Sequence, residues 1–375
     1  MRRIRFHIPY NPPNSIGYLE QVLANGNAAT GGKFYQLCSS KLQTKLHTPS
    51  IYFTNSCTDA LEFAAILANL QAGDEVILPT FTFVSTANAF YLHGCILRFA
   101  DTILERPNIS LETILPLVNA RTKVIVVVHY AGIAVDLDPI LEYAKLHQIL
   151  VIEDAAQGIG AKYKNKYLGT IAPLGAMSFH ATKLISCGEG GCLFINDEKF
   201  LDRASLIFEK GTNRKAFIRN EVSKYEWLDI GSSFGMSEFQ AAVLYAQLEC
   251  LDDLLAHRLN SWKWYMDAFQ LKCAHANLSL PVVPEFATIN GSFFYIILED
   301  ERIRNELQIF LRNKEIESVF HFLALHKSPF YHNKFNQNLP NSEKFESSLL
   351  RLPIHHQILE EDVLKIVECI GEYFT

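Results

Sequence analysis

The first half of the chain alternates short apolar segments with helical ones, and no other feature constrains the fold as strongly. The segments typical of strands lie at 75–79, 95–100, 123–129 and 149–153, and the helical ones at 58–70, 85–93 and 139–147. The strand at 123–129 is β-branched and apolar on both faces, so it belongs in a sheet covered on both sides. This alternation predicts an α/β protein with a mostly parallel sheet between layers of helices.

The pattern changes near residue 250. Before that point, 176–196 indicates two short strands around a glycine-rich turn, and 199–210 and 237–256 are helical. Beyond it, helices are predicted at 262–271, 302–314 and 360–373, and strands at 293–298 and 318–323. A chain of 375 residues exceeds what one core usually holds. We therefore expect a large α/β domain at 1–250 and a smaller α+β domain at 251–375.

Charge and composition exclude several classes of protein. The formal net charge is −6, without the basic surplus of a nucleic-acid binder. Apolar runs such as 124–128 are much shorter than the roughly 20 residues of a membrane span. The eight cysteines are scattered and form no C-x-x-C pair, and no apolar leader follows the N-terminus. We expect reduced thiols, a cytoplasmic location, and no metal, nucleic-acid or membrane partner.

Two elements of the predicted sheet suit a phosphorylated aromatic ligand. Small and hydroxylic residues from Ser56 to Thr58 precede a helix, whose N-terminus binds phosphate well. The alternative is an ordinary helix N-cap by Ser56 or Thr58. Phe83 follows the strand at 75–79, at the sheet edge where α/β proteins bind ligands, and could stack on a ring. The alternative is a core phenylalanine.

Two further elements supply an acid and an amine. Asp154 follows the strand at 149–153, where a carboxylate can keep a ring nitrogen protonated. The alternatives are a helix N-cap for Asp154 and a solvent contact for Glu153. Lys183 lies between a strand and a glycine-rich turn, where burial would lower the pKa of its amine and make it nucleophilic. The alternative is a surface lysine. Together the four elements meet the requirements of pyridoxal phosphate (PLP).

At these residues the sequence resembles the DegT/DnrJ/EryC1/StrS sugar aminotransferases, which are fold-type I, aspartate-aminotransferase-like PLP enzymes. The matching stretches are SCTDALE (56–62), GDEVILPTFTFVSTANAF (73–90), VHYAG (128–132), VIEDAAQG (151–158), EKGTNR (209–214), DIGSSFGMSEFQAA (229–242) and VFHFLALH (319–326). Within the family, the resemblance is strongest to dTDP-4-amino-4,6-dideoxygalactose transaminases. It implies a seven-stranded, mostly parallel sheet, a smaller C-terminal domain and a homodimer with the active site at its interface.

The resemblance also implies a role for each matching residue. Lys183 binds the cofactor and moves the proton, and Asp154 pairs with the pyridine nitrogen. The other implied cofactor contacts are Gln157 at the phenolic oxygen, Phe83 on the ring, and Thr58, Asp59 and Ser178 at the phosphate. Much of the family has Asn-Tyr-Arg where this chain has 233–235, and that Asn reaches the partner subunit's phosphate. Here Ser233 would have to replace it with a shorter side chain.

The implied reaction transfers the amino group of L-glutamate to dTDP-4-keto-6-deoxy-D-glucose, for bacterial surface polysaccharide synthesis. His321 and His326 are candidates for a sugar or diphosphate contact, with a structural role as the alternative. Two other interpretations stay open, and Lys183 argues against a third. The enzyme could act on a C3-keto nucleotide sugar, or the chain could bind nucleotide sugars without turnover. A sugar dehydratase of the same fold would have histidine in place of Lys183.

Overall fold

The computed structural model describes residues 2–331, 334 and 337–375. The strands are β1 (Ile51–Thr54), β2 (Glu75–Pro79), β3 (Ile96–Ala100), β4 (Thr122–Val128), β5 (Leu150–Asp154), β6 (Lys162–Tyr163), β7 (Lys166–Tyr167), β8 (Leu174–Ser178), β9 (Gly191–Ile195), β10 (Ala287–Thr288), β11 (Phe294–Ile297), β12 (Val319–Phe320) and β13 (Leu349–Leu352). The α-helices are α1 (Ser15–Asn25), α2 (Lys33–Leu46), α3 (Cys57–Leu67), α4 (Val84–Tyr91), α5 (Leu111–Ile114), α6 (Leu137–Leu146), α7 (Leu201–Phe208), α8 (Arg214–Ile218), α9 (Glu238–Glu249), α10 (Leu251–Lys272), α11 (Glu301–Asn313), α12 (Pro340–Ser348) and α13 (Glu360–Tyr373).

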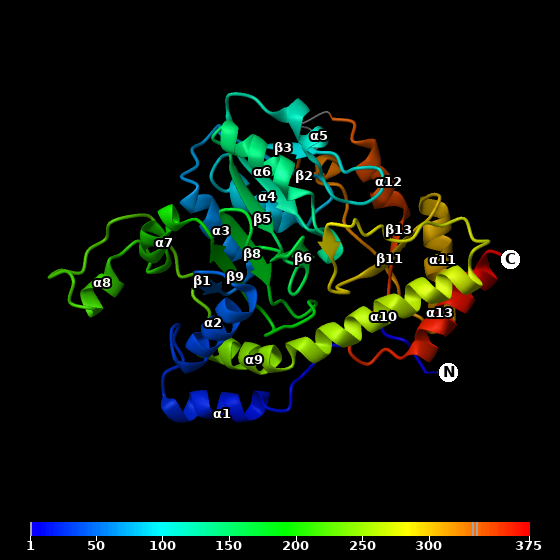
Figure 1. The fold of residues 1–375 in the computed structure, drawn as a ribbon, viewed down its shortest axis with the longest axis horizontal. Coiled ribbons are helices and arrows are strands. Elements are labelled where there is room, and N and C mark those ends of the chain that lie inside the picture. Colours follow the sequence, from blue (N-terminus) through cyan, green and yellow to red (C-terminus); the bar gives the residue numbers. More distant parts are fainter. Residues whose placement is uncertain (1, 332–333, 335–336) are drawn as a thin grey trace.

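A seven-stranded sheet in the order β1-β9-β8-β5-β4-β2-β3 lies between helices (Figure 1). The strands β8, β5, β4, β2 and β3 run parallel, and β9 is antiparallel to both of its neighbours. The predicted sheet, mostly parallel and flanked by helices, is confirmed. Parallel strands end at the same edge of a sheet, so the segments after β2, β4, β5 and β8 meet there.

A second, three-stranded sheet in the order β11-β13-β12 shares one hydrophobic core with residues of α10, α11 and α13. Its core is separate from that of the large sheet and includes Phe294, Leu350 and Ile366. The long helix α10 runs from below the large sheet to this smaller sheet (Figure 1). The helix predicted at 237–256 is in fact two helices, α9 and α10, which meet at Cys250. The domain boundary at 250 stays a prediction.

Several elements were not predicted. In α2, Phe34, Cys38 and Leu42 are buried at intervals of four residues, which is the helical signal that a search for strand–helix alternation passes over. The short β1 offers only four residues of pattern, and Arg351 interrupts the apolar run of β13. Among the helices of the described residues, none has both the length and the apolar character needed to cross a bilayer.

Candidate active site

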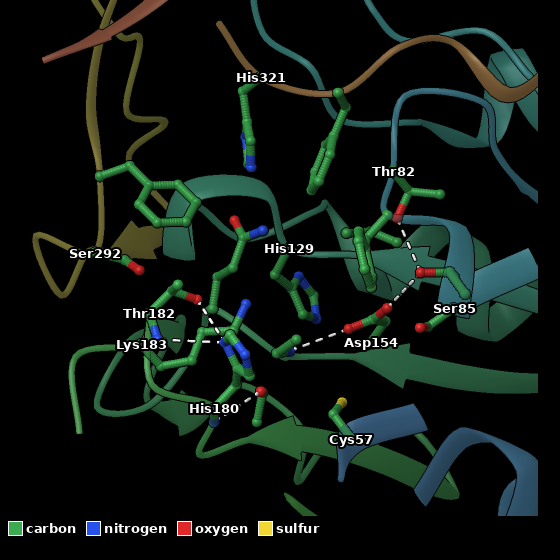
Figure 2. A pocket seen from close by; sticks show the side chains of 18 of the residues that line it. Cys57, Thr82, Ser85, His129, Asp154, His180, Thr182, Lys183, Ser292 and His321 are labelled. Carbon is green, nitrogen blue, oxygen red and sulfur yellow. Dashed lines mark hydrogen bonds between the residues drawn. The ribbon is translucent and has the colours of Figure 1, made fainter. Parts of the chain in front are cut away.

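A cavity of about 760 Å³ opens at the carboxyl edge of the large sheet and extends to the smaller sheet. Most of the site residues predicted from sequence line it, and Figure 2 shows several of them around the pocket. They are Thr58, Phe83, Asp154, Gln157, Ser178, Lys183 and His321. These residues come from segments spread over more than half of the chain. Three other predicted residues, Asp59, Ser233 and His326, are not part of this lining.

Asp154 is the last residue of β5, and its carboxylate is fixed from both sides. The Thr86 hydroxyl donates to Oδ2 at 2.7 Å, and the Ala156 backbone N–H donates to Oδ1 at 3.1 Å. Thr86 is itself 2.9 Å from the Thr82 hydroxyl, so residues at the start of α4 set the orientation of the carboxylate. The helix N-cap interpretation of Asp154 is wrong, because the segment after β5 is a turn and not a helix.

Lys183 lies in the loop between β8 and β9, where its backbone N–H donates to the His180 carbonyl at 2.9 Å. Its side chain is half-buried and lines the cavity, which excludes an ordinary surface lysine. Burial lowers the pKa of the Lys183 amine, and the charge of Arg351 lowers it further. The acidic groups of Cys57 and Asp154 act in the opposite direction and raise this pKa. The amine therefore reaches its neutral, nucleophilic form more readily than a free lysine.

The N-terminus of α3 forms one end of the cavity. Ser56 is the N-cap and accepts from the Asp59 backbone N–H at 3.0 Å, so the N-cap interpretation is correct for Ser56, and the phosphate site stays a prediction. Thr58 lines the cavity and donates to the Ser85 hydroxyl at 2.8 Å. A Cβ atom at Gly191 would lie 2.4 Å from the Cys57 nitrogen, so only glycine lets the helix end pack directly on β9. Asp59, whose N–H serves the cap, lies outside the cavity lining.

Phe83 and Gln157 both line the cavity. Phe83 is 58% exposed at the start of α4, so it is not a core residue, whereas Phe81 is fully buried. Gln157 is buried, and its side-chain oxygen accepts from the Ala131 N–H at 2.6 Å. That bond supports a backbone turn in which Ala131 has a φ of 58°, and it leaves the Gln157 amide group as a donor toward the cavity. Ser178 is buried at the end of β8.

Glu153, for which a solvent contact was the expectation, is fully buried. His129, which lines the cavity, accepts from the Val135 N–H through Nδ1 at 3.2 Å and therefore donates to Glu153 through Nε2 at 3.0 Å. The carboxylate also accepts three backbone N–H groups from one loop, those of Gly169 (2.8 Å), Ile171 (2.7 Å) and Ala172 (2.6 Å). Glu153 thus joins β5, the cavity wall and the 169–172 loop.

The two candidate substrate histidines have different environments. The Tyr130 hydroxyl lies 2.7 Å from His321 Nδ1. Burial raises the pKa of Tyr130 and lowers that of His321, so the hydroxyl donates and the ring proton of His321 lies on Nε2. His326 is buried away from the cavity, with Nδ1 2.8 Å from the Thr80 hydroxyl and Nε2 3.2 Å from Glu343. The structural alternative fits His326 better than a substrate contact.

Two arginines of the cavity lining, Arg258 and Arg351, were not among the site residues predicted from the sequence. Arg351 lies inside an otherwise apolar strand, and a lone charge in such a run was the available signal.

Ser233 is exposed and lines a different cavity of about 520 Å³, between α2 and α7, so within one subunit it does not meet the other site residues.

The donor set fits PLP. A carboxylate, a lysine amine, hydroxyl groups at a helix N-terminus and an exposed aromatic face surround one cavity at the carboxyl edge of a parallel sheet. This combination of fold and site is that of a PLP-dependent aminotransferase. The sequence profile of the DegT/DnrJ/EryC1/StrS aminotransferase family matches residues 11–371, and the chain belongs to that family. Enzymes of this family use PLP, and they are sugar aminotransferases.

Individual relatives cover almost the whole chain. The spore coat polysaccharide biosynthesis protein SpsC of Bacillus subtilis is 30% identical over 97% of this chain and 96% of its own length. GDP-perosamine synthase of Escherichia coli O157:H7 is 29% identical over 98% of this chain and 99% of its own. Helicobacter pylori PseC, an aminotransferase involved in pseudoaminic acid biosynthesis, has a similar structure, with a TM-score of 0.89, 25% identity and coverage of 100% and 99% of the two chains.

Proposed function

We propose that the enzyme transfers the amino group of L-glutamate to C4 of dTDP-4-keto-6-deoxy-D-glucose, giving dTDP-4-amino-4,6-dideoxy-D-galactose and 2-oxoglutarate. The observation that carries the reaction class is the placement of Lys183 and Asp154 in one cavity. The specific sugar is supported by the long stretches that resemble the 4-amino-galactose enzymes. Relatives named for perosamine and for a spore coat polysaccharide support a product used in a bacterial surface polysaccharide such as enterobacterial common antigen.

Each site residue has a defined task in this proposal. When bound, PLP supplies an electron sink for the carbanion at the reacting carbon. Lys183 would hold the cofactor, and its Nζ would take the proton from the donor's α-carbon in the first half-reaction and deliver a proton to C4 of the sugar in the second. Asp154 would accept a hydrogen bond from the protonated pyridine nitrogen and so keep it charged, and Thr86 keeps the carboxylate in place. Thr58 and Ser178 would bind the phosphate, Phe83 would cover the ring, and Gln157 would donate to the phenolic oxygen.

His321 belongs to substrate binding in this proposal, because its Nε2–H is the polar atom that it offers to the cavity. A hydroxyl or ketone oxygen of the sugar would accept that hydrogen bond. The proposed active form is a cytoplasmic homodimer in which Ser233 contacts the partner subunit's cofactor phosphate. Its exposed position and separate cavity leave its side chain available for that contact.

The test is an NMR analysis of the product made from purified protein, PLP, L-glutamate and dTDP-4-keto-6-deoxy-D-glucose. An axial amine at C4 is expected. An equatorial C4 amine would retain the reaction class but contradict the face of proton delivery. Absence of product from protein with visibly bound cofactor would contradict the substrate, and the same assay with the C3-keto isomer would then show whether the enzyme acts at C3.

A further inference from the structure

The segment at 2–8, which we call the N-terminal strap, is attached to the C-terminal part of the chain before it reaches the cavity. Ile4 forms a parallel bridge with Ile316. Its N–H donates to the Glu315 carbonyl at 2.8 Å, and its carbonyl accepts from the Glu317 N–H at 3.0 Å. The side chain of Ile4 is buried in the core of the smaller sheet. Backbone and side-chain contacts therefore both fix the N-terminal strap to the segment that precedes β12.

Glu317 fixes the N-terminal strap at a second point. Its carboxylate accepts from the Phe6 N–H at 2.8 Å and pairs with Arg3 at 2.7 Å. The Phe6 ring lines the cavity, and its centre lies 4.9 Å from the guanidinium carbon of Arg351. Glu317 precedes His321, the residue proposed to contact the sugar, by only four residues. The N-terminal strap and the proposed substrate contact thus depend on one short segment of the chain.

His7, the next residue of the N-terminal strap, contacts the loop that carries Lys183. Its Nε2 lies 2.9 Å from the Ala181 carbonyl oxygen, and because a carbonyl only accepts, the ring N–H donates. Burial lowers the pKa of His7, the bond to Ala181 opposes that shift, and the charges of Arg258 and Arg351 add to it. The ring is therefore neutral near pH 7, with its one proton on Nε2.

The loop at 179–190 has to keep its place during the proposed reaction. The amine of Lys183 would hold the cofactor, then meet the carbon of the donor and that of the sugar, so it needs a fixed position when it is not attached. Gln240 of α9 supports the far end of the loop, where its side-chain amide donates to the Glu189 carbonyl at 3.0 Å. The bond from His7 supports the loop two residues before the lysine.

We propose that His7 is a positioning residue for Lys183, which it holds in place through the Ala181 carbonyl. Because the N-terminal strap is bonded to the segment at 315–317, the amine also keeps its place relative to the substrate contact at His321. A displacement of about 1 Å at a reacting group can lower a rate by about 10²-fold, so a single hydrogen bond at this point has a large effect. The inference rests on the proposed function, since it names a residue that supports the amine used in that reaction.

The test combines the rate at which apoenzyme attaches PLP with hydrogen exchange of the backbone N–H groups at 181–183 in the PLP-loaded enzyme. His7→Ala should slow attachment roughly 10-fold to 100-fold. It should also speed exchange at 181–183 by roughly 3-fold to 10-fold, as expected for one lost hydrogen bond. His7→Gln, whose side-chain amide offers an N–H with a similar reach, should restore most of both values.

His257→Ala is the matched control for the loss of a histidine. The ring of His257 is also partly buried, and its Nε2 lies 3.3 Å from a backbone carbonyl, but that carbonyl belongs to His355 and not to the lysine loop. The control should change neither the attachment rate nor the exchange at 181–183. If it slows attachment as much as His7→Ala does, the effect is not specific to the lysine loop and the positioning role is wrong.

Glu317→Ala tests the N-terminal strap itself, because Glu317 bonds to Phe6 and Arg3 rather than to the lysine loop. It should slow PLP attachment by less than His7→Ala, and it should cause no further loss when it is added to His7→Ala, since both changes release the same support. Losses that add up in the double variant would show that the two residues act independently, which would overturn the strap as the link.

An unchanged attachment rate and unchanged exchange in His7→Ala would contradict the positioning role, and so would a His7→Gln variant as slow as His7→Ala. Should His7→Ala fail to fold, Glu317→Ala still tests the link, because a released N-terminal strap should speed exchange at 181–183. Failure of the proposed function would look different, since wild-type enzyme would then attach PLP and show slow exchange in the loop but transfer no amino group to the sugar.

Discussion

The amine of Lys183 is the single group on which the reaction most depends. Lys183→Ala should abolish the visible absorbance of lysine-bound PLP and lower turnover by at least about 10²–10⁴-fold, the usual contribution of general acid–base help. Spectra and initial rates of the purified variant give both values. Lys164→Ala changes a lysine that forms an exposed ion pair with Asp138, and it should leave both values unchanged. Retention of absorbance and turnover in Lys183→Ala would contradict the assignment.

Substitution of Asp154 should affect proton abstraction much more than cofactor binding. Asp154→Asn retains a partner for the Thr86 hydroxyl but loses the negative charge that stabilises a protonated pyridine nitrogen. The variant should therefore bind PLP with near-normal affinity, while the first half-reaction with L-glutamate slows by about 10²-fold or more. Stopped-flow spectra of that half-reaction, beside an equilibrium titration of PLP, measure the two effects separately. A near-normal rate of the first half-reaction would contradict the proposed role of Asp154 at the pyridine nitrogen.

The pKa of Lys183 gives a prediction with a definite sign. Burial and the Arg351 charge both lower that pKa, so the rate at which apoenzyme attaches PLP should rise with pH through a midpoint below that of free lysine. Arg351→Met removes one cause of the lowering, so the midpoint should move to higher pH. The rate of PLP attachment across a pH series measures it. A midpoint that stays in place or moves to lower pH would show that Arg351 does not act on the amine.

At the scale of elements, Glu153 joins the end of β5 to the loop at 169–172 through three backbone N–H groups. Glu153→Gln replaces an acceptor oxygen by an NH₂ group that faces N–H donors, and a buried donor without a partner costs about 1–3 kcal/mol. Chemical denaturation should show a loss of that size in the free energy of unfolding. Glu142→Gln, on the exposed side of α6, should change it by less than about 0.5 kcal/mol. Equal losses in the two variants would contradict the role of Glu153.

The same elements show which parts of the fold and of the site could be predicted from the sequence alone. The strands β2, β4 and β5 were predictable because their patterns are local, and Asp154 and Lys183 followed from their places next to strands. The burial of Glu153 was not predictable, because its backbone partners lie 16 to 19 residues further along the chain. Nor could sequence bring Arg351 to the cavity, since that contact depends on how the two sheets pack.

At the scale of the whole molecule, one arm of the structure has many exposed apolar side chains. The segment from α8 to residue 230 projects away from the large sheet (Figure 1). Its exposed apolar residues are Phe217, Ile218, Val222, Tyr225, Trp227, Leu228 and Ile230. Such a concentration is unusual for the free surface of a monomer and typical of a protein interface. Ser233 follows directly after this arm, which agrees with the proposed contact of Ser233 with a partner subunit.

Trp227 provides the sharpest test of the homodimer. Its side chain is 81% exposed, so Trp227→Asp should not disturb the fold of one subunit but should place a charge in the interface. Sedimentation equilibrium should show a dimer for the wild type and a shift toward monomer for the variant, with weaker PLP binding because the proposed contact from the partner's Ser233 is lost. Leu271→Asp is the matched control, since Leu271 is 82% exposed on α10, away from the arm. If Trp227→Asp remains as dimeric as the control, the arm is not the interface.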